Sequence, residues 1–292
     1  MAVVTPSTPS PLPDAVILPV IQLALAEDLG RAGDVTGACI PAHARQSFVF
    51  AARRNGVIAG LDCARLAVAA LDPEAVYEPC VADGAIVGAG MHLARVTGRA
   101  RALLTAERTA LNLMGRLSGV ATLTARFVEA VQGTGARITD TRKTTPGLRA
   151  LEKYAVRCGG GVNHRFGLDD AVLIKDNHVA ACGGVGPALD FFRGKNSAGR
   201  LGHLMKVEVE VDSLRQLREA LPYAPDVIML DNFSLEDLRE AVALAGGKVT
   251  LEASGGVDLS TVRAIAETGV DVISVGALTH SAPVLDIGLD AD

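Results

Sequence analysis

Hydrophobic and polar positions follow one regular pattern beyond residue 133, where short apolar runs alternate with amphipathic segments. Six of the apolar runs have the length of strands: residues 136–140, 171–174, 205–211, 226–230, 248–252 and 271–275. The segments between them have the spacing of helices, among them residues 148–157, 213–221, 234–244 and 259–267. Such alternation is typical of a parallel sheet covered by helices.

The number of strands favours an α/β barrel smaller than the eight-stranded form. Residues 162–165 could form a seventh strand. A doubly wound open sheet is the alternative to a barrel. We therefore expect a barrel domain over residues 115–280.

The first third of the chain mixes its elements less regularly. Strand-like runs at residues 47–52, 57–59, 76–81 and 92–96 surround a predicted helix at 61–71, after a helix that ends near residue 29. Residues 103–131 have a helical pattern in which Gly115 and Gly119 permit a bend or close packing. We expect a separate domain over residues 15–114, preceded by a disordered Pro-rich leader at 1–14 that lacks the features of a signal peptide.

Composition excludes several classes of protein. With 49% hydrophobic and 21% charged residues, the 292-residue chain is too apolar for a long disordered protein. Its net charge of −5 argues against a nucleic-acid binder. The five cysteines are scattered without a C-x-x-C pair, which argues against disulfides and zinc and favours the cytoplasm. The apolar stretch at 15–26 is too short to cross a membrane, so we expect no membrane partner.

Polar or glycine residues follow nearly every strand of the predicted barrel. In chain order they are Thr141, Arg142, Lys143, Lys175, Glu208, Glu210, Asp231, Ser254, Gly255, Gly256 and Gly276, with His280 shortly after. The carboxyl ends of the strands form the active-site face of α/β barrels. Solvated loops explain any one of these residues, but the whole set favours a functional rim.

The signs of the charges indicate an anionic ligand. Residues 140–175 carry a net charge of +3, although the whole chain carries −5. Arg149, Lys153 and Arg157 recur at helical spacing and are interpreted as a solvated helix face. The basic residues in turns or at strand ends are better explained by carboxylates or phosphates; they are Arg142, Lys143, Arg165 and Lys175.

Other residues at the rim keep two interpretations. Glu210 and Asp231 suit Mg²⁺ bound together with a phosphorylated substrate, or they pair internally with a lysine. Ser254, Gly255 and Gly256 suit a phosphate at a strand-to-helix turn, or they form a plain tight turn. His164 is either a ligand or a satisfied buried histidine.

Several long motifs resemble the quinolinate phosphoribosyltransferase family. They are DTRKTTPGL at 140–148, EKYAVRCGGGVNHR at 152–165, LIKDNH at 173–178, ERTALN at 107–112, EASGG at 252–256 and GALTH at 276–280. The resemblance implies an N-terminal open α/β sandwich, rejoined by residues 281–292, next to a six- or seven-stranded incomplete α/β barrel. It also implies transfer of phosphoribose from phosphoribosyl pyrophosphate to quinolinate with Mg²⁺, which releases pyrophosphate and CO₂ and yields nicotinate mononucleotide for NAD biosynthesis.

The resemblance also implies roles for residues of this chain. Those that would hold the quinolinate carboxylates are Arg142, Lys143, His164, Arg165 and Lys175, with Thr141 beside them. Arg108 would reach the site of a neighbouring subunit in a homodimer, and a higher oligomer is left open. Glu210 and Asp231 would face the ribose and its metal and, with Lys143, form the catalytic set. The phosphate would be bound by Ser254, Gly255, Gly256, Gly276 and His280.

Three other functions are kept as alternatives. A related phosphoribosyltransferase would act on a monocarboxylate such as nicotinate, although the paired basic residues favour a dicarboxylate. A Schiff-base aldolase would use Lys175 or Lys143 as its amine, which requires a desolvated lysine. A non-catalytic module would bind the anion without turnover.

Residues 193–200 are predicted to form a loop near the rim.

Overall fold

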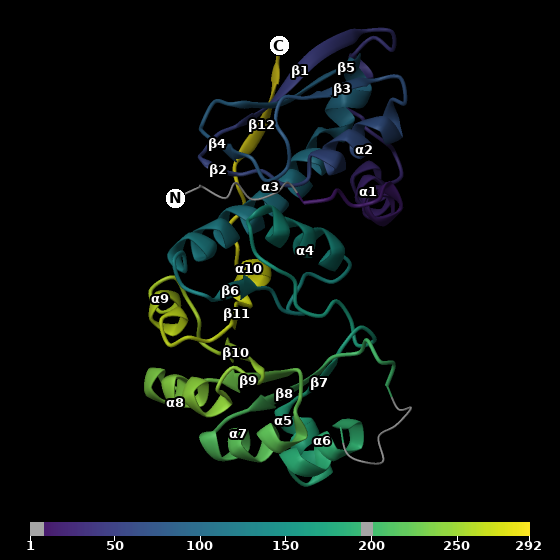
Figure 1. The fold of residues 1–292 in the computed structure, drawn as a ribbon. Helices are drawn as coiled ribbons and strands as arrows, with labels where there is room; N and C mark the ends of the chain where they lie inside the picture. Colours follow the sequence, from purple (N-terminus) through teal and green to yellow (C-terminus); the bar gives the residue numbers. More distant parts are fainter. Residues whose placement is uncertain (1–8, 194–200) are drawn as a thin grey trace. The chain divides into compact units, whose positions relative to one another are not determined.

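The computed structural model describes residues 9–193 and 201–292, which form two compact units (Figure 1). The first unit contains the residues up to Ala125, Thr144–Gly161 and Leu278–Asp292, and the second contains Arg126–Lys143 and Val162–Ala277. Residues 144–161 thus group with the first unit, although they lie inside the predicted barrel range. Most of the predicted leader, and residues 194–200 of the predicted loop, lie outside the described residues.

The first unit is built on an antiparallel sheet of four strands in the order β12-β1-β5-β3. Its strands are β1 (Arg45–Ala52), β3 (Val76–Pro79), β5 (His92–Arg99) and β12 (Ile287–Ala291), and a separate pair is formed by β2 (Gly56–Val57) and β4 (Ile86–Val87). Phe48 of β1 lies opposite Val96 on one side and Ala291 on the other. The last strand of the chain therefore completes a sheet begun by its first strands.

Helices of the first unit are α1 (Asp14–Leu29), α2 (Leu61–Leu71), most of α3 (Ala100–Ala130) and α4 (Arg149–Cys158), with the short η1 (Gly37–Cys39) and α10 (Ala277–His280). Asp83 joins two of them. Its carboxylate accepts hydrogen bonds from the backbone N–H groups of Gly60 and Leu61, at the start of α2, and from the Tyr154 hydroxyl of α4. This link explains why α4 groups with the first unit.

Gly115 and Gly119 of α3 allow close packing, the second of the two predicted alternatives. A Cβ atom at Gly119 would clash with the carbonyl oxygen of Pro283, and one at Gly115 would lie 2.9 Å from that of Leu285. The Leu285 N–H donates to the Gly115 carbonyl at 3.0 Å. The chain leading to β12 therefore lies directly on the backbone of α3.

The second unit is a six-stranded parallel sheet with the order β6-β11-β10-β9-β8-β7. The strands are β6 (Arg137–Thr139), β7 (Val172–Ile174), β8 (Val207–Val211), β9 (Val227–Asp231), β10 (Thr250–Ser254) and β11 (Val272–Ser274). From β7 to β11 each strand pairs with the next, and β11 returns to β6, which is the circular order of a barrel.

The barrel is incomplete, because β6 and β7 do not pair in the part of the chain that the structure describes. The candidate seventh strand at 162–165 contributes only a bridge between Val162 and Thr139, so the barrel has six strands. A doubly wound sheet would reverse its strand order at a switch point, which this sheet does not do. The predicted fold class, an incomplete α/β barrel together with a second α/β domain, is confirmed.

Helices connect the parallel strands: α5 (Asp176–Cys182), α6 (Val185–Arg193), α7 (Leu214–Ala220) with η2 (Leu221–Tyr223), α8 (Leu235–Ala245) and α9 (Val262–Ala266). The valines of β8 are buried on one face of the strand, and Glu208 and Glu210 alternate with them on the other. No helix within residues 9–193 and 201–292 is both long and apolar enough to span a membrane.

Candidate active site

A cavity of about 540 Å³ lies at the carboxyl ends of the barrel strands, and we call it the site cavity. Nine of the predicted site residues line it: Thr141, Arg142, Lys143, His164, Arg165, Lys175, Glu210, Asp231 and Ser254. They follow or end five different strands and are separated by up to 113 positions in the sequence. The parallel barrel brings them together because all its strands end at the same rim.

One side of the site cavity is basic. Arg142 and Arg165 are half-buried, and the Nε atom of each is buried without a hydrogen-bond partner among the described residues. Arg165 does donate from Nη1 to the Ala171 carbonyl at 3.1 Å. Burial and the nearby charge of Arg142 lower the pKa of Arg165. Two crowded guanidinium groups with unused donors are the arrangement expected where an anion binds.

The opposite side is acidic, and its charges have partners. The Lys175 ammonium lies 2.7 Å from Glu210 Oε2, and Asn232 Nδ2 donates to Asp231 Oδ2 at 2.7 Å. The Lys175 N–H donates to His178 Nδ1 at 2.9 Å, which holds the start of α5. Because Lys175 is ion-paired and 47% exposed, it does not meet the requirement of an aldolase for a desolvated amine.

His164 lies between the basic side and the floor of the site cavity. Its backbone N–H donates to Asp140 Oδ1 at 3.0 Å, and its Nδ1 accepts the Arg165 N–H at 2.8 Å. Asp140 is fully buried and also accepts a bond from Asn163. A buried aspartate thus fixes the loop that carries the His164-Arg165 pair.

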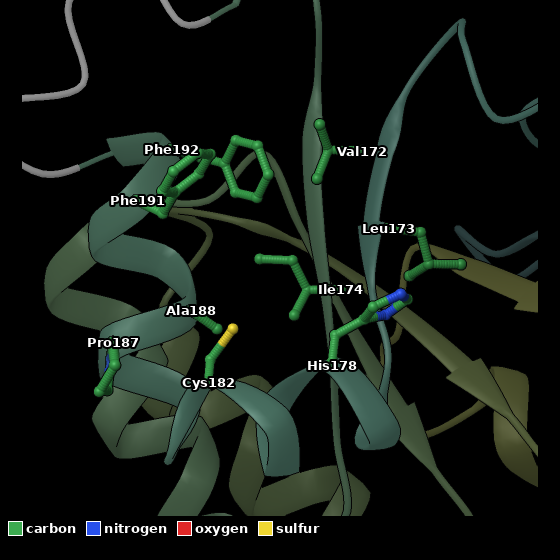
Figure 2. Close-up of a pocket in the computed structure, with 9 residues that line it drawn as sticks. All are labelled: Val172, Leu173, Ile174, His178, Cys182, Pro187, Ala188, Phe191 and Phe192. Carbon is green, nitrogen blue, oxygen red and sulfur yellow. The ribbon is translucent and has the colours of Figure 1, made fainter.

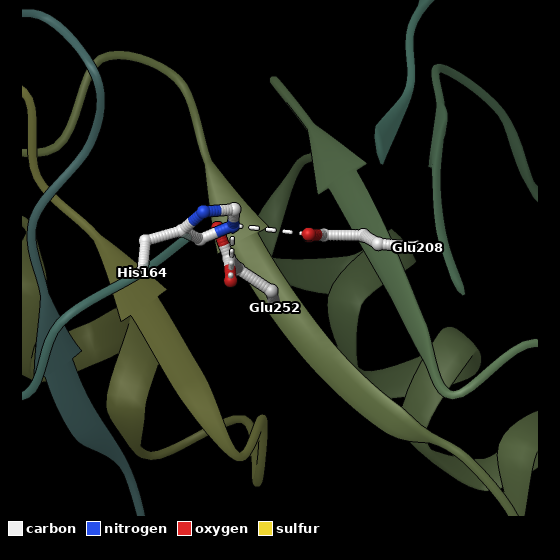
Figure 3. A group of neighbouring side chains, drawn as sticks. All are labelled: His164, Glu208 and Glu252. Carbon is white, nitrogen blue, oxygen red and sulfur yellow. Dashed lines mark ion pairs between the residues drawn. The ribbon is translucent and has the colours of Figure 1, made fainter. Parts of the chain in front are cut away.

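Two floor residues have no role predicted from the sequence, although Glu208 is among the polar residues expected at the rim. Glu208 and Glu252 are buried side chains of β8 and β10, and their Oε2 atoms lie 3.0 and 3.6 Å from His164 Nε2 (Figure 3). Burial, reinforced by the charge of Glu208, raises the pKa of Glu252 to about 7. A glutamate on the inward face of an otherwise apolar strand was the available signal in the sequence.

The predicted phosphate residues are only partly brought together. Ser254 lines the site cavity, whereas Gly255, Gly256 and Gly276 do not. Gly255 has φ of +93°, and a Cβ atom there would clash with the Asn232 side chain. Glycine at this position is therefore required by the backbone and by Asn232, whatever the loop binds.

Arg108 and His280 belong to the first unit, so the site cavity of the second unit does not include them. Arg108 is 64% exposed and lies 4.0 Å from Glu107. It lines a smaller hollow of about 340 Å³ with Leu111, Asn112 and residues 284–287. His280 Nδ1 lies 2.6 Å from the Ser281 hydroxyl.

A second cavity of about 500 Å³ lies against β7, α5 and α6, as Figure 2 shows. Its lining is mainly apolar and consists of Val172, Leu173, Ile174, His178, Cys182, Pro187, Ala188, Phe191 and Phe192. His178 Nδ1 already accepts the Lys175 N–H. The described residues of its lining include no paired cations that would recognise phosphate or carboxylate, so we assign the anion chemistry to the site cavity.

An incomplete α/β barrel with a cation-lined cavity at its carboxyl rim defines an enzyme of the barrel class that binds small polyanions. The family model for the N-terminal domain of quinolinate phosphoribosyl transferase matches residues 34–118, and the model for its C-terminal domain matches residues 120–290. The chain belongs to the quinolinate phosphoribosyl transferase family.

Individual relatives agree over nearly the whole chain. A nicotinate-nucleotide pyrophosphorylase [carboxylating] from Mycobacterium leprae is 49% identical, covering 92% of this chain and 95% of the relative. A probable enzyme of the same name from Synechocystis is 42% identical over 98% and 97% of the two chains. The solved nicotinate-nucleotide pyrophosphorylase from Francisella tularensis superposes with a TM-score of 0.90 at 39% identity, covering 97% and 98%.

Proposed function

We propose that the site cavity binds quinolinate and phosphoribosyl pyrophosphate and converts them to nicotinate mononucleotide, pyrophosphate and CO₂. Membership in the quinolinate phosphoribosyl transferase family supports this reaction and places it in NAD biosynthesis. The observation that carries the proposal is the pair of half-buried Arg142 and Arg165 side chains at a cavity of about 540 Å³, each with an Nε donor that has no partner among the residues the structure describes.

Quinolinate would bind against the basic side of the site cavity. Its two adjacent carboxylates match the two guanidinium groups of Arg142 and Arg165, with Lys143 and Thr141 on the same loop. A monocarboxylate such as nicotinate would leave one of the two arginines without a counterion in a half-buried position. The dicarboxylate is therefore favoured for two reasons: it attracts both arginines, and it leaves neither of them desolvated without a counterion.

The ribose would face the acidic side. As the quinolinate ring nitrogen forms its bond to C1 of the ribose, the bond from C1 to the pyrophosphate oxygen breaks and positive charge develops on the sugar. Glu210 and Asp231 would stabilise that charge because their carboxylates are already oriented by Lys175 and Asn232. Lys143 would assist the departing phosphates as a point charge.

Mg²⁺ fits the donor set of this side. Two carboxylates, Glu210 and Asp231, line the same cavity, and Mg²⁺ prefers few protein oxygens together with water and substrate phosphates. When bound, the ion would neutralise the pyrophosphate leaving group. Ser254 and the loop glycines Gly255, Gly256 and Gly276, all of the second unit, would contact the 5-phosphate through N–H and hydroxyl donors.

Decarboxylation needs no covalent nucleophile. Once the ring nitrogen carries the ribose, it is cationic and stabilises the electron pair that stays on C2 when the C2–carboxylate bond breaks and CO₂ leaves. C2 then takes a proton. The chain's own contribution is to position both substrates and to hold the remaining carboxylate against the arginines.

The functional unit would be a homodimer in the cytoplasm. Arg108 lies in the first unit with an exposed guanidinium group, and it would complete the site of a partner subunit. The five cysteines are odd in number and scattered without a C-x-x-C pair, which favours a reducing compartment.

The test is direct. The purified chain is incubated with quinolinate, phosphoribosyl pyrophosphate and Mg²⁺, and CO₂ and nicotinate mononucleotide are measured. Nicotinate replaces quinolinate in a parallel reaction, and labelled carboxylate at C2 traces the CO₂. Product from nicotinate but not from quinolinate would support the monocarboxylate alternative, and binding of quinolinate without any turnover would support an anion-binding module.

A further inference from the structure

The cluster of His164, Glu208 and Glu252 lies on the floor of the site cavity, and the proposed reaction gives its two glutamates no role. Its three facing atoms, one from each side chain, all lie within 4.8 Å of one another. In Figure 3 the two glutamates come from separate strands and point at the same edge of the imidazole ring. Three groups of this kind make either a metal site or a hydrogen-bonded cluster.

The hydrogen bond at His164 Nδ1 decides between a metal site and a hydrogen-bonded cluster. His164 Nδ1 accepts the Arg165 N–H at 2.8 Å, so Nδ1 carries a lone pair and the ring hydrogen is on Nε2. Nε2 therefore donates toward Glu208 Oε2 at 3.0 Å, with Glu252 Oε2 at 3.6 Å. A metal ion at this point would need the Nε2 lone pair, which this tautomer does not offer.

The two glutamates are not equivalent. Both are more than nine-tenths buried, and each keeps its Oε1 atom without a hydrogen-bond partner among the described residues. Two negative charges so close together in a buried place repel each other strongly, so one carboxyl holds a proton. Burial raises the pKa of Glu252, and Glu208 is the nearer acceptor of the Nε2 hydrogen. The pair therefore divides into a direct acceptor at 3.0 Å, Glu208, and a more distant neighbour at 3.6 Å, Glu252.

We propose that Glu208 is a positioning residue that holds His164 in the Nε2–H tautomer, so that its Nδ1 orients the backbone of Arg165 toward the substrate carboxylate. This inference deepens the proposed function and rests on it. The chain of contacts is continuous: Glu208 accepts from His164, and His164 accepts from Arg165. Asp140 holds the same loop from the other side.

The inference is tested with Glu208→Gln and Glu252→Gln, and with Glu240→Gln as a matched control. Glu240 is a half-exposed partner of Arg218, away from the cluster. We expect Glu208→Gln to raise KM for quinolinate about tenfold or more, because it replaces the carboxylate that lies nearest to His164 Nε2, with little change in KM for phosphoribosyl pyrophosphate. We expect KM for quinolinate in Glu252→Gln, in which the amide resembles the protonated acid, to stay within about threefold of the parent value.

A second measurement is independent of activity. The ring ¹⁵N signals of the six histidines are recorded on the substrate-free protein, and His164 is assigned by its loss in His164→Gln. We expect the Nε2–H tautomer in the parent and in Glu252→Gln, and a mixture of tautomers in Glu208→Gln. If Glu208→Gln does not fold, Glu208→Asp keeps the charge at a shorter reach and is measured in its place.

Several results would overturn the inference. One is an equal rise of KM for quinolinate in Glu208→Gln and Glu252→Gln. Another is an unchanged KM for quinolinate in Glu208→Gln. A third is binding of Zn²⁺ or Mg²⁺ at the cluster, seen as a metal-induced shift of the His164 signals. Failure of the parent to turn over quinolinate while His164 shows the expected tautomer would instead count against the proposed function.

Discussion

The two sides of the site cavity differ in how their charges are satisfied. On the acidic side, Glu210 accepts from Lys175 and Asp231 accepts from Asn232, each at 2.7 Å. On the basic side, Arg142 and Arg165 face the cavity with buried Nε atoms that have no partner in the described ranges. The acidic side is therefore preorganised before substrate arrives, whereas the basic side is completed only by an anion.

This difference implies a division of labour. An unpaired, half-buried cation contributes most to binding, because the ligand relieves both its desolvation and its repulsion from the neighbouring cation. Carboxylates that already have partners add little to binding of the substrate in its ground state. They contribute when positive charge develops on the ribose in the transition state. Variants on the two sides should therefore change different kinetic constants.

The largest effect is expected on the basic side. We expect Arg165→Ala to lower kcat/KM for quinolinate by about 10² to 10³, mainly through KM, because one carboxylate loses its bidentate partner while Arg142 remains. Steady-state kinetics with each substrate varied in turn measures this. Arg165→Lys should recover part of the loss, and Arg218→Ala, at an exposed surface pair, serves as the control. An unchanged KM for quinolinate in Arg165→Ala would remove the assignment of the basic side.

A smaller effect with the opposite signature is expected on the acidic side. We expect Asp231→Asn to lower kcat by about 10-fold to 10²-fold with KM for quinolinate nearly unchanged, because the carboxylate acts on charge that develops at the ribose. The same kinetic measurements apply, and Asp237→Asn on the exposed first turn of α8 is the control. If KM for quinolinate rises as much as kcat falls, the acidic side contributes to binding of quinolinate as well, and the two sides do not have separate roles.

A third expectation concerns a cation supplied from outside the site cavity. Arg108→Ala and Lys175→Ala subunits are each expected to be nearly inactive, whereas an exchanged mixture should recover about one quarter of the parent activity. That fraction follows because half of the dimers are mixed and each mixed dimer keeps one intact site. Activity is measured before and after subunit exchange, with mixed dimers verified by differential tags. No recovery in verified mixed dimers would place Arg108 outside the site.

Much of the fold and of the basic side could be predicted from the sequence. The barrel followed from alternating apolar strands and helices, and the rule that parallel strands end at one rim then grouped Arg142, Lys175 and Asp231. Grouping of α4 with the first unit could not be predicted in this way, because it depends on the contact between Tyr154 and Asp83, 71 positions apart.

The cluster on the floor was missed for a related reason. Glu208 and Glu252 occupy strand positions whose neighbours are apolar, and only the barrel brings them to the same nitrogen of His164. Whether a glutamate in a buried strand is paired, protonated or ligated depends on tertiary distances that local periodicity does not contain. Short strands such as β4, with two residues, also carry too little pattern to be predicted.

The smallest effect concerns the stability of the floor on which both sides rest. The pKa of Glu252 is raised from 4.5 to about 7 in the folded protein, so folding favours its protonated form. Below pH 4.5 the group is protonated in both states and stability is unaffected; between pH 4.5 and 7 the unfolded chain loses its proton first, and stability falls. Above pH 7 the loss stays constant, at on the order of 3 kcal/mol.

We therefore expect Glu252→Gln, which cannot ionise, to stabilise the protein at alkaline pH and to change little in acid. The difference in Tm between variant and parent should grow by a few degrees from about pH 5 to about pH 8, measured by thermal unfolding. Glu240→Gln at the exposed surface should show no such growth. A Tm difference that is constant over this range would mean that Glu252 is ionised throughout, and both carboxylates of the floor would then have to share His164 as charged acceptors.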